Sequence, residues 1–360
     1  MELRDDRGIA VIGGGLAGAV LAWRLTRMGH PVTVLTGGAT VARDATAISG
    51  GLVRAFETDP LAATAAALSL AELRADAGLR ELAGYREFGS SYLLPPGSTE
   101  AAIRPVLDLV GELLPGAAEL MDAAELKAFR GLPPGILAVV EPAAGCLSPA
   151  RLRAGLLAAV EAVGGTVRAE AVTALAPDGE LRTAARGGER FRAVVVAAGP
   201  WTPRLLRSWG LPDQGLRAKQ IQYTLGGTSQ LPPGMGAFVD ETSGLYGRPD
   251  GPHRMLLGLP TDRWDMDPGA LTPLPELATQ VAACAAERLG LADWPGPDAR
   301  TATAADCWAP PGGPAGLLLR RLLPHGPLFT FTGGTGGAAK TVLANSRDAA
   351  TMLVEAFPAS

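Results

Sequence analysis

Hydrophobic residues open the chain in two different periodicities. Residues 9–12 (Ile-Ala-Val-Ile) form a short apolar run bounded by glycines, and apolar residues then recur at helical spacing over 16–28 until Gly29. A second apolar run follows at 31–35. The pattern predicts strand, helix and strand, which is a βαβ unit with parallel strands and a right-handed crossover.

Helical patterns recur in the first half of the chain. Residues 61–82, rich in Ala and Leu, predict one long helical region with Gly78 as a candidate break near its end. Residues 149–163 predict an amphipathic helix with Ser148 as its N-cap and Pro149 at its first position. Between these helices prolines interrupt the pattern, so only short pieces are expected; they stand at positions 95, 96, 105, 115, 133 and 134.

Two kinds of strand are predicted in the second half. Residues 191–197 are apolar at nearly every position, as in a strand buried on both faces, and together with 166–169 and 171–175 they are expected to rejoin the opening unit. From residue 216 to residue 260 polarity alternates, which predicts an antiparallel sheet and hence a second domain. The remaining predicted elements are a helix over 274–289, a strand over 328–331, a glycine-rich turn over 333–337 and a helix over 341–357.

Composition and charge limit the classes of function. Hydrophobic residues make up 47% of the 360 residues, which is typical of a globular protein. A net charge of -4 without a block of like charge argues against nucleic acid or an anionic membrane as a partner, and favours small molecules. The start of the chain lacks the pattern of a secretory signal, so we expect a cytoplasmic protein. The three cysteines and three histidines are spaced too far apart to predict a disulfide framework or a metal site.

A glycine motif gives the first chemical indication. Gly13, Gly15 and Gly18 follow the pattern G-x-G-x-x-G between a predicted strand and helix, where the backbone approaches a pyrophosphate and the helix N-terminus stabilises its charge. An acidic residue that binds the ribose hydroxyls is expected at the end of the second strand, but Thr36 stands there. Arg43 either assists in holding the adenosine or is a solvated loop charge. The motif alone is also compatible with an NAD-dependent enzyme.

Four segments carry a family resemblance. They are residues 13–18, 45–54, 194–201 and 333–340, which together reach from one end of the chain to the other. In these segments the chain resembles the D-amino acid oxidase superfamily, nearest the monomeric sarcosine oxidase and glycine oxidase branch. The resemblance implies an α/β fold (α+β overall): a Rossmann-like FAD-binding domain with a parallel sheet, and a substrate domain whose antiparallel sheet lies over the flavin.

The resemblance also implies domain boundaries and cofactor contacts. The FAD-binding domain is expected to be discontinuous, over 1–80, 145–210 and 300–360, and the substrate-binding domain to comprise 81–144 and 211–299. Cys307 lies where several members of the branch attach the flavin through a thioether; a small buried hydrophobe is the alternative. The remaining expected FAD contacts are Gly13, Gly15, Leu16, Ala17, Gly18, Thr36, Arg43, Ser49, Gly50, Gly51, Val172, Ala198, Gly199, Trp201, Gly334, Thr335, Gly336, Gly337, Ala338 and Lys340.

The substrate residues are likewise implied by the resemblance. Arg54 and Lys340 fall where the sarcosine oxidase pattern has two cations that grip the substrate carboxylate; structural ion pairs are the alternative. Tyr223, Tyr246 and Arg248 are expected to line the pocket, unless the tyrosines serve packing and the arginine is a solvated turn charge.

Three departures from the family pattern alter the expected pocket. The lysine that promotes the reaction with oxygen corresponds to Leu256, the active-site histidine to Pro260, and an aromatic residue after the cysteine to Ala309. The pocket should therefore be wider and less polar than one built for sarcosine. We expect oxidation of the C–N bond of a small carboxylate-bearing amine, with oxygen or an unknown acceptor. A dehydrogenase that uses another acceptor and a non-catalytic flavin-binding subunit are the alternatives.

Overall fold

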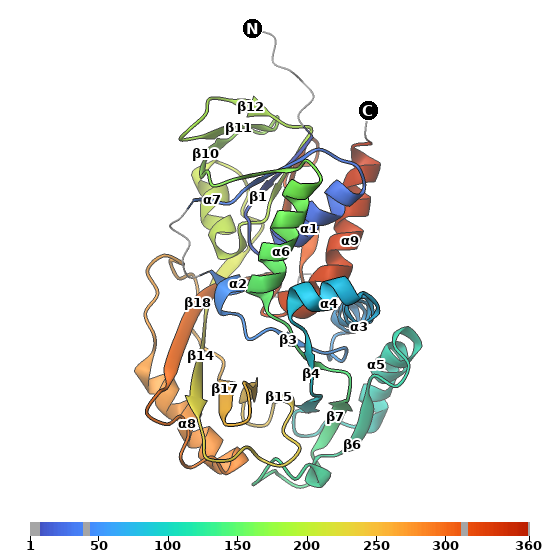
Figure 1. Ribbon diagram of the computed structural model, residues 1–360, viewed down its shortest axis with the longest axis vertical. Helices are drawn as coiled ribbons and strands as arrows, with labels where there is room; N and C mark the ends of the chain where they lie inside the picture. Colours follow the sequence, from blue (N-terminus) through green and yellow to red (C-terminus); the bar gives the residue numbers. More distant parts are fainter. Residues whose placement is uncertain (1–7, 39–43, 311–315, 359–360) are drawn as a thin grey trace.

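Two large sheets share the chain in the computed structural model, which describes residues 8–38, 44–310 and 316–358 (Figure 1). The first sheet has six strands in the order β19-β20-β13-β1-β2-β9, and all neighbours are parallel except β19 and β20. It confirms the predicted parallel sheet and its opening βαβ unit. The strands are β1 (Ile9–Ile12), β2 (Val32–Leu35), β9 (Thr166–Arg168), β13 (Ala193–Val196), β19 (Leu318–Arg321) and β20 (Leu328–Thr332).

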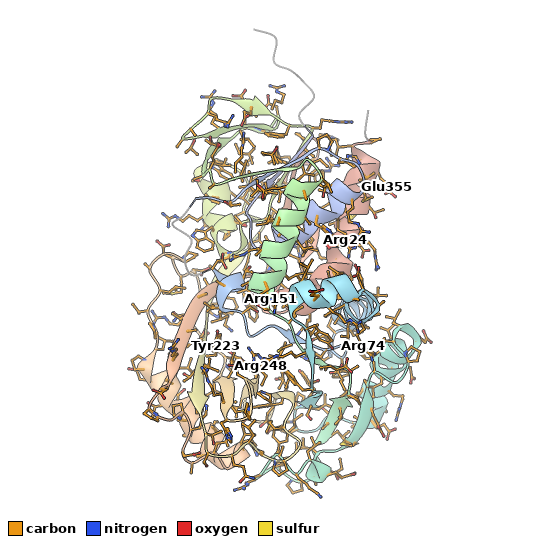
Figure 2. All side chains as sticks on the ribbon, in the orientation of Figure 1. Arg24, Arg74, Arg151, Tyr223, Arg248 and Glu355 are labelled. Atoms are coloured by element: carbon orange, nitrogen blue, oxygen red, sulfur yellow. The ribbon has the colours of Figure 1, made fainter. Side chains whose placement is uncertain are left out.

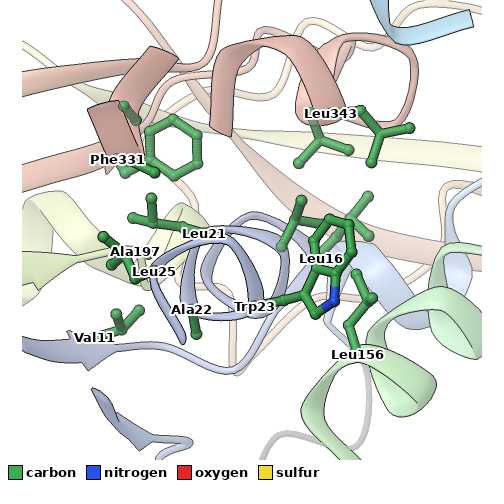
Figure 3. Close-up of a cluster of buried hydrophobic side chains, with 14 of the residues drawn as sticks. Val11, Leu16, Leu21, Ala22, Trp23, Leu25, Leu156, Ala197, Phe331 and Leu343 are labelled. Atoms are coloured by element: carbon green, nitrogen blue, oxygen red, sulfur yellow. The ribbon is translucent and has the colours of Figure 1, made fainter. Parts of the chain in front are cut away.

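The central strands of this sheet are buried on both faces, because each face has its own cover. Ile9 and Val11 of β1 point into a core formed with the helices of one face, and Ala10 and Ile12 point into a core on the other. Figure 3 shows the first core, where Leu21 packs beside Phe331. Its helices are α1 (Leu16–Arg27), α3 (Pro60–Ala75), α4 (Ala77–Ala83), α6 (Pro149–Ala162) and α9 (Ala338–Ala356). The second face is covered by α7 (Thr202–Ser208) and a small sheet of β10 (Val172–Leu175), β11 (Glu180–Thr183) and β12 (Glu189–Arg190).

The second large sheet has eight strands in the order β18-β14-β17-β16-β15-β5-β7-β6. It is antiparallel apart from the β15/β5 pair, and β14 alternates strictly between half-buried and buried positions. The strands are β5 (Ser90–Leu93), β6 (Glu119–Asp122), β7 (Leu137–Glu141), β14 (Arg217–Gly227), β15 (Ala237–Asp240), β16 (Tyr246–Pro249), β17 (Arg254–Gly258) and β18 (Arg300–Trp308). Helix α8 (Pro275–Leu289) packs on it, and α5 (Glu100–Leu113) packs on α3.

Short elements connect the two layers. A three-stranded sheet in the order β3-β8-β4 lies between them (Figure 1). It is made of β3 (Leu52–Val53), β4 (Arg86–Glu87) and β8 (Gly145–Cys146), and the other short elements are α2 (Ala45–Ile48) and the 3-10 turns η1 (Ala123–Glu125) and η2 (Gly199–Trp201).

The structure corrects several predicted elements. The helical region predicted over 61–82 divides into α3 and α4 at Asp76, whose side chain accepts a hydrogen bond from Leu79 N and caps α4, while Gly78 lies inside α4. Helix α5 forms where prolines were expected to break the chain. Thr99 caps its start, and the burial of Ile103, Val106, Leu107 and Val110 offsets the cost of Pro105 inside it. Strand β10 joins the small sheet rather than the parallel one. Strand β18 pairs with β14 in the eight-stranded sheet, although the predicted boundaries assign it to the FAD-binding domain.

Candidate active site

The turn between β1 and α1 requires glycine for two separate reasons. Gly13 has a φ of 120°, and a Cβ there would lie 2.3 Å from the carbonyl oxygen of Ala197. A Cβ on Gly18 would lie 2.0 Å from the carbonyl oxygen of Gly13, so Gly18 allows the helix to pack against the turn. Gly15 caps α1 without a side chain, and a Cβ on it would meet only Thr46 Oγ1, at 3.4 Å. The first turn of α1 is therefore open to an anion, as a pyrophosphate requires.

A cavity of about 930 Å³ runs from this turn to the eight-stranded sheet. Its size is at the upper end for small-molecule sites. The helix α9 also begins at the cavity wall with an uncapped glycine, Gly337, so two helix N-termini open into it. The predicted site residues that line the cavity are Gly13, Gly15, Leu16, Ala17, Thr36, Ser49, Gly50, Gly51, Arg54, Val172, Ala198, Gly199, Trp201, Tyr223, Tyr246, Gly334, Thr335, Gly336, Gly337, Ala338 and Lys340.

Three predicted site residues do not line the cavity, and a fourth lies outside the described residues. Gly18 and Cys307 are not part of the lining, nor is Arg248, while Arg43 lies outside the described residues. Arg248 donates from Nε to the carbonyl oxygen of Gly50 at 2.7 Å and pairs with Asp250, so it holds a turn that lines the cavity. Figure 2 shows Arg248 and Tyr223 on the side of the eight-stranded sheet.

Cys307 points away from the cavity. Its neighbours Asp306 and Trp308 in β18 line the cavity, and successive side chains of a strand point to opposite faces. Only 1% of Cys307 is exposed, and burial raises the pKa of its thiol to about 12. The thiol is therefore protonated near neutral pH, which makes it a poor nucleophile.

A carboxylate stands near Thr36 that the sequence pattern did not indicate. The Thr36 hydroxyl donates to the carbonyl oxygen of Arg168 at 3.4 Å, and Gly37 N donates to the carbonyl oxygen of Glu170 at 3.1 Å. The side chain of Glu170 lines the same end of the cavity. Its Oε2 accepts from Thr183 Oγ1 at 2.8 Å, and this contact, with Arg186, holds the pKa of the carboxyl below its usual value. Glu170 was missed because it is remote from Thr36 in sequence.

The two predicted substrate cations share one buried carboxylate. Arg54 Nη2 lies 2.9 Å from Glu57 Oε1, and Lys340 Nζ pairs with the same oxygen. Arg54 also donates to the carbonyl oxygen of Phe56 at 2.6 Å and stacks over the Tyr92 ring at 4.4 Å. Both cations line the cavity, whereas Glu57 lies behind them and is not part of the lining. If all three groups are ionised, the cluster carries a net charge of +1, which one substrate carboxylate would balance.

Burial shifts the titration of this cluster. Burial alone would raise the pKa of Glu57, but Arg54 and Lys340 outweigh it and hold the pKa below its usual value. Burial lowers the pKa of Lys340 despite the neighbouring Glu57. Glu141, which is fully buried, accepts from Ala55 N at 2.6 Å and Phe56 N at 2.8 Å, and burial raises its pKa. Glu141 therefore fixes the backbone segment that carries both Arg54 and Glu57.

The remaining wall is aromatic and aliphatic. Tyr246 donates its hydroxyl to the carbonyl oxygen of Gln222 at 2.9 Å, and burial raises its pKa as it does that of Tyr223. Of the three departures from the family pattern, Leu256 and Pro260 line the cavity and Ala309 does not. The tyrosines can donate hydrogen bonds, but they are unsuited to act as bases near neutral pH.

Comparisons with known proteins agree with this architecture. A family model described as FAD dependent oxidoreductase (DAO) matches residues 8–348. The bifunctional protein MnmC of Paracidovorax citrulli, named for tRNA 5-methylaminomethyl-2-thiouridine biosynthesis, is 30% identical over 275 residues, 65% of this chain; the chain spans 41% of that protein's length.

Solved structures share the fold. L-proline dehydrogenase from P. horikoshii has a TM-score of 0.79 at 17% identity, over 98% of this chain and 95% of that one. Glycine oxidase from Geobacillus kaustophilus has a TM-score of 0.75 at 20% identity, over the same shares of the two chains. NikD, an amino acid oxidase of nikkomycin biosynthesis, has a TM-score of 0.74 at 23% identity, again over 98% and 95%.

The described residues contain neither a membrane-spanning helix nor a metal-binding group. Over 8–38, 44–310 and 316–358, no helix is long and apolar enough to cross a membrane. The same residues contain no group of three His, Cys, Asp or Glu side chains arranged to hold a metal ion.

The position of Glu170 leads to a testable expectation for FAD binding. Replacing Glu170 by glutamine should raise the Kd for FAD about tenfold, because a charged acceptor for the ribose hydroxyls is replaced by a neutral one. Titration of the apoprotein with FAD, followed by tryptophan fluorescence, measures this. Glu180→Gln is the matched control, since Glu180 lies in the same small sheet but does not line the cavity. Equal Kd values for Glu170→Gln and the wild type would contradict the assignment.

Proposed function

The chain belongs to the family of FAD-dependent oxidoreductases, and from this premise we propose that it oxidises the C–N bond of a small amine that carries a carboxylate. An N-substituted glycine or a cyclic imino acid is the substrate class. The product is an imine, which water hydrolyses to an amine and an oxo acid. The observation that carries the proposal is the pair of cations, Arg54 and Lys340, that line the cavity around one buried carboxylate.

The fit to FAD rests on the chain's own turns. The N-termini of α1 and α9 open into the cavity with glycine at the N-cap, although Thr46 Oγ1 accepts from Leu16 N at 2.9 Å at the start of α1. The glycine turns at Gly13 and Gly50 keep the cavity wall free of Cβ atoms. Bound FAD would supply the acceptor for the hydride, which carries the two electrons of the oxidation. We propose that Glu170 accepts hydrogen bonds from the ribose, in place of the acidic residue that Thr36 replaces.

In this proposal the protein acts mainly by positioning. Arg54 and Lys340 bind the substrate carboxylate and so orient the hydrogen on the carbon next to the nitrogen. Leu256 and Pro260 exclude water from the reacting carbon. No strong base is required, since the substrate amine reacts in its unprotonated form. The raised pKa values of Tyr223 and Tyr246 keep both hydroxyls protonated, and that of Tyr246 donates to the carbonyl oxygen of Gln222.

The electron acceptor defines a second candidate activity. Leu256 occupies the position of the family's oxygen-promoting lysine, and its methyl groups pack 3.6 and 3.7 Å from where a Cβ on Gly50 would lie. This apolar contact favours a dehydrogenase that passes electrons to a protein or a quinone instead of oxygen. A flavin-binding subunit without catalysis is a third candidate, and it requires that no amine bleaches the bound flavin.

The charge of the chain favours a small amine over a nucleic acid as the substrate. The name of the MnmC relative refers to tRNA, and that relative extends well beyond the region of similarity. The net charge of this chain is -4, whereas binding to the phosphate backbone requires a basic surface. We therefore retain a small amine as the proposed substrate.

The first test concerns Lys340. Lys340→Met should raise the KM for a carboxylate-bearing amine at least about tenfold, since a charged hydrogen bond is lost, while the KM for the corresponding amide changes little. Anaerobic bleaching of the flavin by N-alkyl amino acids, and the steady-state rates, measure this. A KM for the acid that is unchanged in the variant would remove Lys340 from the carboxylate site.

The control for this test uses pH. Because burial lowers the pKa of Lys340, the ammonium and its attraction for the carboxylate are lost as pH rises through a value below that of a free lysine. The KM should rise over that range in the wild type but not in Lys340→Arg, whose guanidinium stays protonated. The ratio of the two KM values at each pH is independent of the ionisation of the substrate, because both proteins meet the same substrate.

The second test concerns attachment of the flavin. We propose that no thioether forms with Cys307, since its thiol is protonated and faces away from the cavity. Acid precipitation of the purified protein should release all of the yellow colour into the supernatant. Colour that stays with the pellet in the wild type, and is lost from it in Cys307→Ala, would establish the covalent bond instead.

The third test concerns the acceptor. The wild type should reduce an artificial dye faster than it produces hydrogen peroxide, and Leu256→Lys should increase peroxide production without a comparable change in dye reduction. Leu256→Met is the control for altered packing. Peroxide formed in the wild type as fast as the dye is reduced would identify an oxidase.

A further inference from the structure

Lys219 is a cation at the cavity wall that the sequence reasoning missed. It lies in β14, where Lys219 and Tyr223 belong to the half-buried face and line the cavity. Its ammonium group sits 4.7 Å from the ring centre of Trp264 and 4.6 Å from that of Trp308. The two indoles meet edge to face, with centroids 5.3 Å apart. The ammonium is therefore fixed in position by two aromatic rings.

Lys219 lacks the neutralising partner that the other cations of the wall have. Arg54 and Lys340 pair with Glu57, and Arg153 pairs with Asp44. Within residues 8–38, 44–310 and 316–358, no carboxylate lies within 4.0 Å of the Lys219 ammonium. The nearest acidic influence is that of Asp262, and burial lowers the pKa of Lys219.

The carboxylates near Lys219 are already engaged. Asp306 is its partner in the register of β14 and β18, but Asp306 accepts from Cys307 N at 2.8 Å and from Gly336 N at 3.1 Å. Asp262 accepts from the indole nitrogen of Trp264 at 3.0 Å. Neither forms an ion pair with the lysine, so its positive charge faces the cavity uncompensated.

A second donor beside Lys219 also lacks an acceptor. The indole nitrogen of Trp308 is buried and has no hydrogen-bond partner among the described residues. A Cβ on Gly336 would lie 3.7 Å from the Trp308 ring, and one on the next residue, Gly337, would lie 3.1 Å from Lys340 Cε. Trp308 and Lys340 thus flank adjacent residues of one turn. The Lys219 ammonium sits over the Trp308 ring, and this ring and Lys340 lie beside the same turn.

We propose that Lys219 and the indole N–H of Trp308 bind a second acidic group of the substrate, which is therefore a dicarboxylic amine. The inference rests on the proposed function and deepens it, because it adds a substrate class to the amine oxidation. A second carboxylate would accept from both donors and neutralise the ammonium. Lys340 and Arg54 would hold the first carboxylate on the other side of the turn.

The test compares substrates that differ only in the second charge. N-propylglycine and N-pentylglycine are each paired with the compound in which the terminal methyl group is a carboxylate. In the wild type the diacid of the preferred length should have a KM about tenfold lower than its neutral counterpart, as expected for a charged hydrogen bond. In Lys219→Met the two KM values should converge, and in Lys219→Arg the preference should persist. If, in the wild type, the diacid and its neutral counterpart have equal KM values in both pairs, the inference is overturned.

Matched variants separate recognition from packing. Arg217 also stacks on the Trp264 ring, at 4.7 Å, but it pairs with Asp265 and does not line the cavity. Arg217→Met should keep the preference for the diacid. Trp308→Phe keeps a ring under the ammonium and removes the N–H, so the preference should decrease. If Lys219→Met instead releases the flavin and leaves the preference intact, the cluster serves the cofactor and the inference is wrong.

A binding measurement keeps this inference independent of turnover. Calorimetric titration of the flavin-loaded protein with glutarate and with pentanoate, in which a methyl group replaces one carboxylate, measures the effect of the second charge without any reaction. Glutarate should bind about tenfold more tightly than pentanoate in the wild type and equally tightly in Lys219→Met. If no amine bleaches the flavin, the proposed function fails, while a glutarate preference that depends on Lys219 still supports the anion site. Equal binding of the two acids by the wild type would refute it.

Discussion

The site depends on one buried carboxylate that joins the eight-stranded sheet to the small three-stranded sheet. Glu141 ends β7 of the eight-stranded sheet, and it accepts hydrogen bonds from Ala55 N and Phe56 N, just beyond β3. A fully buried carboxylate is strongly unfavourable unless its oxygens are satisfied, so this contact permits little variation in how the segment runs. Arg54 and Glu57 flank these two amides in the chain, so the path of the backbone sets the directions of their side chains. The geometry of the cation pair is therefore a consequence of how the sheets are joined.

Local sequence patterns predicted the strand and helix on either side of the glycine turn. They did not predict contacts that depend on residues distant in the sequence. The βαβ unit was predictable because Gly13, Gly18 and the apolar runs beside them act within one short segment. Helix α5 was missed because a proline pattern was taken to outweigh its Thr99 cap and apolar face. Glu57 and Glu170 were missed because a single carboxylate in sequence carries no sign of its partners. Glu170 comes beside Thr36 only because β9 pairs with β2, and Glu57 meets Lys340 only because α9 packs near the segment after β3.

The end of β2 shows how a lost residue can be replaced in space. Thr36 cannot bind a diol as a carboxylate does, and its hydroxyl is already directed to the carbonyl oxygen of Arg168. The backbone bond from Gly37 to Glu170 brings the next segment of chain to the same point, and Glu170 carries its charge there. In the proposed function Glu170 takes the place of the acid that Thr36 replaces. A motif with one missing member is therefore weak evidence against nucleotide binding.

The distribution of charge along the cavity limits what can bind there. Arg54, Lys340 and Glu57 leave one net positive charge at one place, and Lys219 provides another beside Trp308. Between them Leu256, Pro260 and the tyrosines offer little that could screen either charge. In such a medium a buried ammonium is costly, so burial lowers the pKa of Lys219 and also that of Lys340, despite its pairing with Glu57. A ligand with one negative charge would relieve only one of these two costs. In the proposal above, a substrate with two negative charges, spaced across the glycine turn, would relieve both.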